Sequence, residues 1–555
     1  MLIGKRSAME TININFDDIN LTQSIESVIR ARLGPIALQS DFRRSLKSNA
    51  DAAVVIRAGI SKTAGRSLEA DFERLDGIEA ARYSKQKLFL RFSEHFLSAR
   101  MDWQLACNFD ACRPFQNHNV LVAFCDPNAN KALHVGHLRN IAIGNALASL
   151  WETLGADVQR QSVVCDIGRN IAESIAGLIA AGAAQYLDGS ELLSPRLGAL
   201  YAKYVADCGL QIEDALSADA PIVRELARHD DEADRVLDLW RSGDQDIHAI
   251  WKAAIARVMQ EQAHTLSRLG VVIERNIPES NSIQHVDAMI EKLKRKSTIF
   301  QDIDGSIVLE TGRSDYARCV LARSDGFPTE HLRALILWDS IRGEIPGLDR
   351  LVHVMGQEWR TSTEIRLELL DRLQDDGAWR QYELVPHQVV RTDGSDMKSS
   401  HGNSILIDDL CDAMERYFHE NADYGELQKS SPMIKSAVMA PMLNSDMNDI
   451  IDVSFDLFFN ESWNPGLRVA RALAMTRGAE PAPAMCQDVR FMLFQAERLT
   501  RMIETAAIKS DPRLVVRHLI RLADNRLEAA GPVPSDALLR LLLMRGARAL
   551  GWAAR

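Results

Sequence analysis

The chain has 555 residues, which is enough for three or four domains at about 150 residues each. Charged residues make up 25% of the chain and hydrophobic residues 46%, the proportions of a folded protein, so we expect no long disordered stretch. The formal net charge of −11 argues against indiscriminate nucleic-acid binding, but it leaves room for a locally basic groove on an acidic protein.

The cysteines and the apolar segments predict a reduced, cytoplasmic setting. The eight cysteines are scattered, and none forms paired C-x-x-C or histidine spacings typical of a zinc site, so we expect no bound metal of this kind. The N-terminus lacks the basic-then-apolar pattern of a signal peptide. Apolar stretches such as residues 175–182 are too short to span a bilayer, so we expect no membrane association.

The first 115 residues mix helical patterns with short strand-like runs, including Lys87 to Phe92, and predict a separate α+β unit. A short apolar run, Asn119 to Phe124, then reads as a buried strand that ends at a turn beginning with Asp126. A helical pattern follows as far as Gly155.

Two histidines lie where this loop becomes the helix. His134 and His137 flank the helix start, where backbone N–H groups and the helix dipole favour an anion. Gly136 between them lets a phosphate chain or a base approach the backbone closely. The pattern therefore favours a nucleotide-phosphate site, although histidines that merely satisfy a helix N-terminus are an alternative.

Further strand-like runs alternate with helical patterns as far as about residue 420. The runs are residues 158–164, 271–273, 351–355 and 388–390, and such alternation predicts a parallel, doubly wound α/β sheet of Rossmann type. Residues 183–269 are mostly helical and polar and read as an insertion in residues 116–420. Only helices are suggested in residues 421–555, where Val516, Leu519 and Ala523 share an apolar face.

The loop after the first core strand resembles the HIGH signature of class I aminoacyl-tRNA synthetases, in its arginyl-tRNA synthetase version. The resemblance rests on Pro127, Asn128, Lys131 and residues 134–139. It implies that His134 and His137 bond phosphate oxygens, that Lys131 adds positive charge, and that Asn128 binds the α-amino or carboxylate group of the amino acid.

Residues 396–405 resemble the second class I signature, the mobile KMSKS loop. Met397, Ser400, Gly402 and Asn403 fit that pattern, but Asp396 and Ser399 stand at the two lysine positions. Lys398 is the only cation in the segment and would have to reach the β- and γ-phosphates from a neighbouring position. A polar surface loop without catalytic work is the alternative.

The segments expected to hold the amino acid match the family less well. Residues 164–168 resemble a V-G-D-W-G segment, of which Asp166 and Gly168 are kept, and Gly356 lies in a V-V-G-x-E-Q-like element. The resemblance makes Glu279 the partner of the substrate guanidinium, since planar guanidinium groups are best held by charge-assisted bonds. The family's Y-x-x-x-D pair, however, is replaced by Glu330 and Ala334, and its glutamine by Trp359. Glu330 could substitute for the missing aspartate.

The resemblance extends to both ends of the chain. Residues 1–115 look like the family's N-terminal additional domain, which contacts the tRNA elbow, and residues 464–475 resemble the start of its helical anticodon-binding domain. It implies an arginine--tRNA ligase that uses ATP and Mg²⁺, binds arginine and tRNA, and acts as a monomer or weak oligomer. A paralogue with another amino acid and a catalytically silent tRNA-binding relative are the alternatives.

Overall fold

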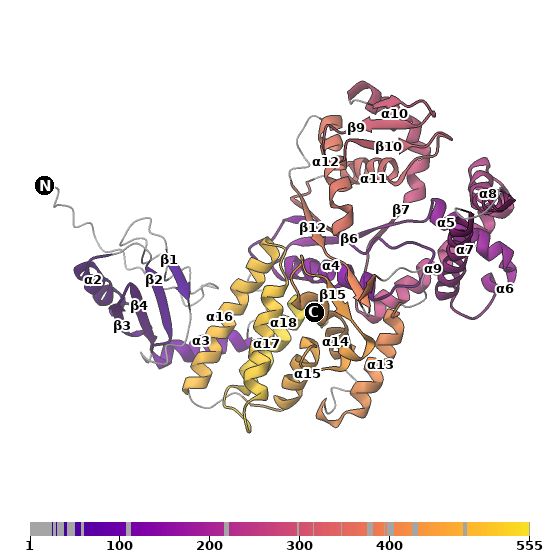
Figure 1. Cartoon of the computed structure of the whole chain (residues 1–555). Coiled ribbons are helices and arrows are strands. Elements are labelled where there is room, and N and C mark those ends of the chain that lie inside the picture. Colours follow the sequence, from indigo (N-terminus) through magenta and orange to yellow (C-terminus); the bar gives the residue numbers. More distant parts are fainter. Residues whose placement is uncertain are drawn as a thin grey trace. The chain divides into compact units, whose positions relative to one another are not determined.

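The structure is a computed structural model of the chain, and its described residues fall into two compact units (Figure 1). It describes residues 25, 29, 38–41, 50–56, 60–106, 113–215, 221–296, 299–314, 316–345, 347–374, 381–392, 394–396, 404–424, 431–480 and 485–553. One unit combines Met1–Pro114, Thr153–Gly155 and Arg468–Ala549, and the other combines Phe115–Glu152, Ala156–Leu467 and Leu550–Arg555. The three predicted domains and their boundaries stay predictions.

The second unit is built on a five-stranded parallel sheet in the order β12-β11-β5-β6-β7. The chain runs outward from β5 through β6 to β7, and later returns to place β11 on the other side of β5. The order thus reverses between β5 and β11, which in open α/β sheets opens a crevice at the carboxyl ends of the strands. The strands are β5 (Asn119–Ala123), β6 (Asp157–Val164), β7 (Arg275–Pro278), β11 (Arg350–Gly356) and β12 (Tyr382–His387).

The predicted Rossmann-type sheet is confirmed, but two of its strands were misplaced. Val271 to Ile273 form no strand: Gly270 has a φ of +70° and the Val271 N–H bonds to the Leu266 carbonyl, so this apolar run closes the end of helix α9 (Gln245–Arg268). The last strand lies at residues 382–387 rather than 388–390. Its mixed burial and Pro386 suit an edge strand and hide the usual apolar signal.

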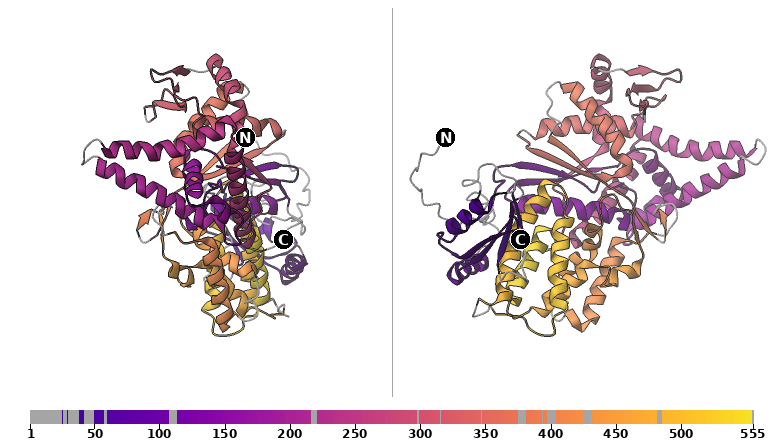
Figure 2. Two further views of the ribbon diagram at one scale, coloured as in Figure 1. Left: turned by 90° about the vertical axis from the view of Figure 1, so that its right-hand side faces the viewer. Right: turned by 60° about the vertical axis from the view of Figure 1, so that its left-hand side comes forward.

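Helices connect these strands and form a helical segment between β6 and β7. Helix α4 (Val135–Thr153) links β5 to β6 and is buried along most of its length. After β6 the chain continues through α5 (Arg169–Ala180), α6 (Ala183–Leu187), α7 (Leu193–Ala215), α8 (Pro221–Ser242) and α9, whose long helices stand out in Figure 2. Trp251 of α9 lies in the apolar core that this segment shares with α5.

A small antiparallel sheet in the order β10-β9-β8 follows β7, with three helices around it. The short helix η2 (Glu279–His285) starts directly at the end of β7, and α11 packs against it. The other elements are α10 (Val286–Lys296), β8 (Ile299–Gln301), β9 (Ile307–Glu310), β10 (Arg318–Ala322), α11 (Glu330–Glu344), η3 (Gln357–Trp359) and α12 (Arg360–Gln374).

The rest of the second unit is not purely helical. Strand β15 (Ile451–Val453) pairs with β13 (Val390–Thr392), which also pairs with β14 (Ser395–Asp396), so the prediction of helices alone beyond residue 421 was wrong at this point. A three-residue strand carries too little alternation to be seen in sequence. The helices here are α13 (Ile407–Glu420), α14 (Ser431–Asn444), η7 (Phe455–Phe459) and the start of α15 (Pro465–Met475).

The first unit joins an antiparallel sheet to a helical bundle. The sheet has the order β1-β2-β4-β3, and buried ion pairs link this part to α16: Arg100 with Glu497, and Arg490 with Asp51. Helices α16, α17 and α18 run alongside one another in Figure 2, with Val516, Leu519 and Ala523 buried between them as predicted. The elements are β1 (Leu38–Asp41), β2 (Ala52–Ile56), α2 (Lys62–Phe72), β3 (Ile78–Ser84), β4 (Lys87–Phe92), α3 (Glu94–Ala106), α16 (Gln487–Ile508), α17 (Arg513–Leu527) and α18 (Asp536–Ala549).

Within the part of the chain that the structure describes, no helix is both long enough and apolar enough to cross a membrane.

Candidate functional site

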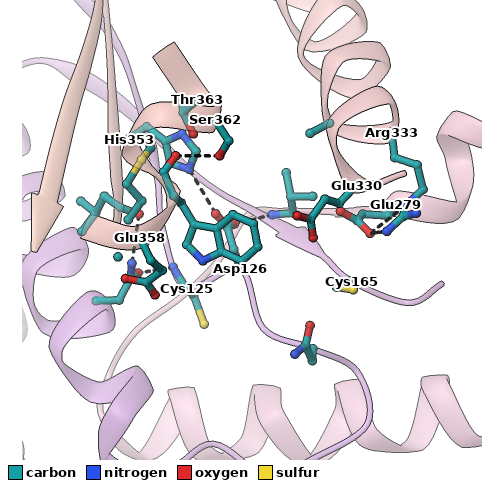
Figure 3. A pocket seen from close by; sticks show the side chains of 18 of the residues that line it. Cys125, Asp126, Cys165, Glu279, Glu330, Arg333, His353, Glu358, Ser362 and Thr363 are labelled. Carbon is teal, nitrogen blue, oxygen red and sulfur yellow. Dashed lines mark hydrogen bonds and ion pairs between the residues drawn. The ribbon is translucent and has the colours of Figure 1, made fainter. Parts of the chain in front are cut away.

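A cavity of about 560 Å³ opens at the carboxyl ends of the parallel strands. This volume suits a small-molecule site, and its place at the strand-order reversal is where such folds bind ligands. Figure 3 shows part of the lining. Half of the lining residues carry charged or titratable side chains, namely Cys125, Asp126, Lys131, His137, Cys165, Glu279, Glu330, His331, Arg333, His353, Glu358, Arg366 and His387.

The backbone is strained where β5 ends at the cavity. Cys125 and Asp126 have φ values of +80° and +38°, a region that residues other than glycine rarely adopt. Surrounding bonds hold this conformation: the Cys125 N–H donates to Asn140 Oδ1 at 2.6 Å, and Asp126 Oδ1 accepts from the Val163 N–H at 2.7 Å. Strain held in this way is typical of functional sites, and it directs the Asp126 carboxylate to the cavity wall.

Asp126 begins a partly buried chain of polar groups that sequence reasoning missed. Its Oδ2 lies 3.2 Å from His353 Nε2 (Figure 3). His353 Nδ1 bonds to the Tyr382 hydroxyl. Burial lowers the pKa of His353 despite the nearby carboxylate, so the neutral ring donates from Nε2 to Asp126 and accepts from Tyr382. The available signal was a histidine inside an otherwise apolar strand.

The His-Gly-His loop presents two neutral histidines. The Gly136 N–H donates to His134 Nδ1 at 3.1 Å, and the His134 N–H donates to His137 Nδ1 at 3.2 Å. Burial lowers the pKa of His134 to about 3 and that of His137 well below its usual value. Because both Nδ1 atoms accept backbone bonds, the ring protons lie on Nε2, and each ring is a hydrogen-bond donor rather than a cation.

The predicted phosphate-binding residues are brought together only in part. Lys131, Gly136 and His137 line the cavity. His134 is not among the lining residues; it is buried and its ring packs 4.0 Å from that of His137, centroid to centroid. Burial also lowers the pKa of Lys131. His134 therefore orients His137 from behind.

Asn128 lines the cavity as predicted for a group that contacts the amino acid. Its backbone carbonyl accepts a bond from Gln262 Nε2 at 2.9 Å, and the residue bridges to Cys165 in the manner of a parallel strand. The loop between β5 and α4 is thus fixed from two sides.

The KMSKS-like loop falls largely outside the described residues. Met397, Lys398 and Ser400 belong to that part, so their predicted roles stay predictions. The described residues that follow are tied to the His-Gly-His loop: the Val135 N–H donates to the Ile405 carbonyl at 2.9 Å, and the Ile407 N–H donates to the Leu133 carbonyl at 3.1 Å. The two signature segments therefore meet at one place.

The other end of the cavity contains an ion pair that the sequence did not predict. Glu279, at the start of η2, is buried, and its Oε2 lies 3.1 Å from both Nε and an Nη of Arg333 (Figure 3). Burial raises the pKa of Glu279 above its usual value, while Arg333 opposes the shift. The carboxylate predicted to hold a substrate guanidinium is bonded here to a guanidinium of the same chain.

Two predicted site residues support this pair instead of lining the cavity. Asp166 accepts bonds from the Ser280 N–H at 2.9 Å and from Ser280 Oγ at 2.6 Å, which holds the chain next to Glu279. Gly168 has a φ of +124°, and a Cβ placed there would lie 3.4 Å from an Arg333 Nη. Residues with a side chain rarely adopt this backbone conformation, which favours glycine at this position.

Three other predicted residues line the cavity. Glu330 lies in the first turn of α11, and Gly356 ends β11. Trp359 lines it too and is 46% exposed, so its indole is available for contact with a ligand. A Cβ at Gly356 would lie 2.3 Å from a Glu358 carboxylate oxygen, so a side chain here would displace Glu358.

The buried histidines predict that the protein loses stability in mild acid. Burial lowers the pKa of His387 from 6.5 to about 4, and its ring bonds to the Gln388 carbonyl and to Asn140. The unfolded chain therefore binds protons between these pH values while the folded protein does not, so the free energy of unfolding falls with falling pH. The expected slope is about 1.4 kcal/mol per pH unit for each such histidine.

Urea denaturation at a series of pH values between 7.5 and 4.5 measures this slope. A His387→Gln variant, which keeps a polar amide but cannot titrate, is expected to show a shallower dependence than the wild type. Parallel dependences would show that His387 does not contribute.

Among the described residues, no group of three or more His, Cys, Asp or Glu side chains is placed to hold a metal ion. Mg²⁺ commonly binds through substrate phosphates and one or two carboxylates. The cavity provides such carboxylates in Asp126 and Glu358.

Comparison with known proteins shows that the chain is similar to arginyl-tRNA synthetases. The family model described as class I tRNA synthetases (R), catalytic domain, matches residues 107–424, more than half of the chain. The arginine--tRNA ligase of Amoebophilus asiaticus is 23% identical over 454 residues, 75% of each chain. That of Treponema denticola is 23% identical over 476 residues, 80% of this chain and 78% of the relative. That of Flavobacterium psychrophilum is 26% identical over 326 residues, 56% of this chain and 52% of the relative.

Solved structures share the fold over nearly the whole length. The arginyl-tRNA synthetase of Thermus thermophilus superposes with a TM-score of 0.69 at 19% identity, covering 95% of this chain and 97% of that one. The Plasmodium falciparum enzyme superposes with a TM-score of 0.62 at 14% identity, covering 98% and 99%.

Proposed function

Because the chain belongs to the arginyl-tRNA synthetase family of class I enzymes, we propose that it is an arginine--tRNA ligase, which activates arginine with ATP and transfers it to tRNA. The observation that carries the proposal is the His-Gly-His loop at the carboxyl end of β5. It places the Nε2–H of His137 beside Gly136 and Lys131 on the wall of one cavity.

These groups suit the first half of the reaction. Attack of the arginine carboxylate on the α-phosphate of ATP forms the adenylate and releases pyrophosphate, with extra negative charge developing on phosphate oxygens in between. Such a reaction needs fixed donors aimed at that charge and little else. We assign this work to His137 and Lys131, with His134 orienting His137 and Gly136 leaving room for the nucleotide.

The amino acid would lie across the same cavity. We assign Asn128 to its α-amino or carboxylate group and Trp359 to contact along its length, since both line the cavity. Glu279 and Glu330 are the candidate carboxylates for the guanidinium group, while Gly356 borders the nucleotide. Lys398, with Met397 and Ser400, would approach the β- and γ-phosphates from the KMSKS-like loop.

Transfer would complete the reaction without a protein nucleophile. A hydroxyl of the terminal adenosine of tRNA attacks the activated carbonyl and releases AMP. Mg²⁺ would accompany ATP and neutralise phosphate charge. We place the activity in the cytoplasm, where scattered reduced cysteines are expected, and a monomer or weak oligomer remains the prediction for the assembly.

A paralogue that activates a different amino acid is the second candidate. The Glu279–Arg333 ion pair favours it, because the chain's own guanidinium occupies the carboxylate that the family resemblance assigns to arginine.

Amino-acid-dependent exchange of pyrophosphate into ATP tests the proposal. Each of the twenty amino acids is tested with and without total tRNA, and a reaction lacking amino acid serves as the blank. Arginine is expected to support exchange above all others. Exchange with another amino acid would establish the paralogue, and exchange with none under either condition would contradict both candidates.

A further inference from the structure

The Glu279–Arg333 pair is built into the wall of the cavity and is held from several sides. Two donors of Arg333 meet the same carboxylate oxygen, and an Arg333 Nη donates to the Pro328 carbonyl at 2.8 Å. The guanidinium carbon also lies 6.0 Å from the centre of the Phe327 ring. Arg333 is thus a fixed part of the site and not a surface side chain that happens to point inward.

The chain next to the pair is held in place. Asp166 fixes Ser280, the residue after Glu279, and a Cβ at Gly168 would be in ordinary van der Waals contact with an Arg333 Nη. Both Glu279 and Arg333 nonetheless line the cavity, so a ligand entering from the opening reaches the same pair. A cationic substrate side chain would meet a carboxylate whose charge is already matched.

Glu330 is differently placed. It comes from the first turn of α11, three residues before Arg333, and such residues lie on the same face of a helix. Its side chain is exposed to the cavity and has no hydrogen bond or ion pair with the residues that the structure describes. Near the pair, Glu330 therefore offers the unmatched negative charge.

We propose that Arg333 is a specificity-determining residue: it occupies Glu279 as a built-in guanidinium and leaves recognition of a cationic substrate side chain to Glu330. The inference rests on the proposed function in using arginine as the ligand. It extends that function by assigning the substrate side chain to Glu330 and by naming Arg333 as the group that keeps Glu279 from binding it.

The test is a gain of binding. Replacing Arg333 with methionine frees Glu279 while filling much of the space, so arginine can bond to both carboxylates. The Arg333→Met variant is expected to bind L-arginine at least about tenfold more tightly than the wild type, a change of about 1.4 kcal/mol. L-Citrulline, which replaces the guanidinium with a neutral urea group, is expected to show no gain. Titration calorimetry without ATP measures both.

Two further variants assign the gain to Glu279 and to Glu330. The double variant Glu279→Gln/Arg333→Met removes the freed carboxylate and is expected to lose the gain. The Glu330→Gln substitution is expected to weaken arginine binding at least about tenfold in the wild-type background. The loss of arginine affinity is expected to be smaller in the Arg333→Met background, where Glu279 can also bind the guanidinium of the substrate.

Arg160→Met is the matched control. Arg160 forms a buried two-bond pair with Glu152, at 2.6 and 2.8 Å, away from the cavity lining. Its loss removes a similar ion pair, and no gain of arginine binding is expected. A gain in this variant equal to that in Arg333→Met would overturn the proposal.

A folded Arg333→Met variant with wild-type arginine affinity would overturn the proposal as well. If this variant does not fold, Arg333→Gln replaces it, because a neutral amide removes the positive charge that matches Glu279. Unchanged arginine affinity in that variant would be equally decisive. Failure of the proposed ligase function can be distinguished from failure of the proposed role of Arg333. Wild-type enzyme without arginine-dependent exchange, combined with gained arginine binding in Arg333→Met, would refute the ligase and support the role of Arg333.

Discussion

Replacement of His137 with alanine is expected to lower arginine-dependent pyrophosphate exchange by about 100- to 1,000-fold, the usual effect of removing one donor aimed at developing charge. His137 Nδ1 accepts the His134 N–H, so the ring donates from Nε2 on the cavity wall. Burial lowers its pKa, so this donor is neutral throughout the physiological range. The expected loss therefore reflects a missing hydrogen bond rather than a missing positive charge.

The measurement is the exchange rate at saturating ATP and arginine, with circular dichroism to verify folding. A His137→Gln variant retains an N–H at similar reach and is expected to recover part of the rate. His518→Gln is the matched control, because His518 is another buried histidine with a pKa lowered to about 3, but it lies in α17 of the other unit. An unchanged rate in His137→Ala would remove this residue from the site.

Replacement of Arg139 with methionine is expected to lower the free energy of unfolding of the second unit, which contains the parallel sheet, by about 3 to 5 kcal/mol. Arg139 is 0% exposed, and its guanidinium donates to three backbone carbonyls: Gln388 at 2.8 Å, and Asp446 and Asp449 at 2.6 Å each. Methionine fills the space but leaves these buried acceptors without a donor. The segments around β13 and β15 would lose their anchor to α4.

Urea denaturation followed by circular dichroism measures this loss. Arg139→Lys supplies a single donor nitrogen, which cannot reach all three separated carbonyls, and is expected to fall between the wild type and Arg139→Met. Arg350→Met is the control, since the Arg350 pair with Glu383 is about 30% exposed and is worth about 1 kcal/mol or less. Equal losses in Arg139→Met and Arg350→Met would show that the carbonyl contacts do not stabilise the unit.

The position of the His-Gly-His loop between β5 and α4 could be predicted from sequence because it is local. The strand, the loop with Gly136 and His137, and the start of α4 follow one another within a short stretch, and their pattern of apolar and turn-forming residues is specific. The alternation of strands and helices likewise predicted the parallel sheet. It failed at residues 271–273, where apolar residues close a helix, and at β12, where an edge strand is half polar.

The contacts at the Glu279 end of the cavity could not be predicted in the same way, because they join segments that are distant in sequence. Glu279 and Arg333 are 54 residues apart and meet only because α11 packs on η2. The Asp126–His353 contact spans 227 residues and depends on β11 lying beside β5. The family resemblance predicted Glu279 as the partner of a substrate guanidinium and gave no sign of Arg333 beside it.

The sequence by itself thus determined the parallel α/β core, the position of the His-Gly-His loop and the family, since each depends on residues close together in the chain. Only the tertiary structure decided that His134 stands behind His137, that Asp166 and Gly168 support the wall, and that Arg333 occupies Glu279. The physical reason is that a buried charge takes whichever partner the packing brings within bonding distance, and sequence spacing does not encode that choice.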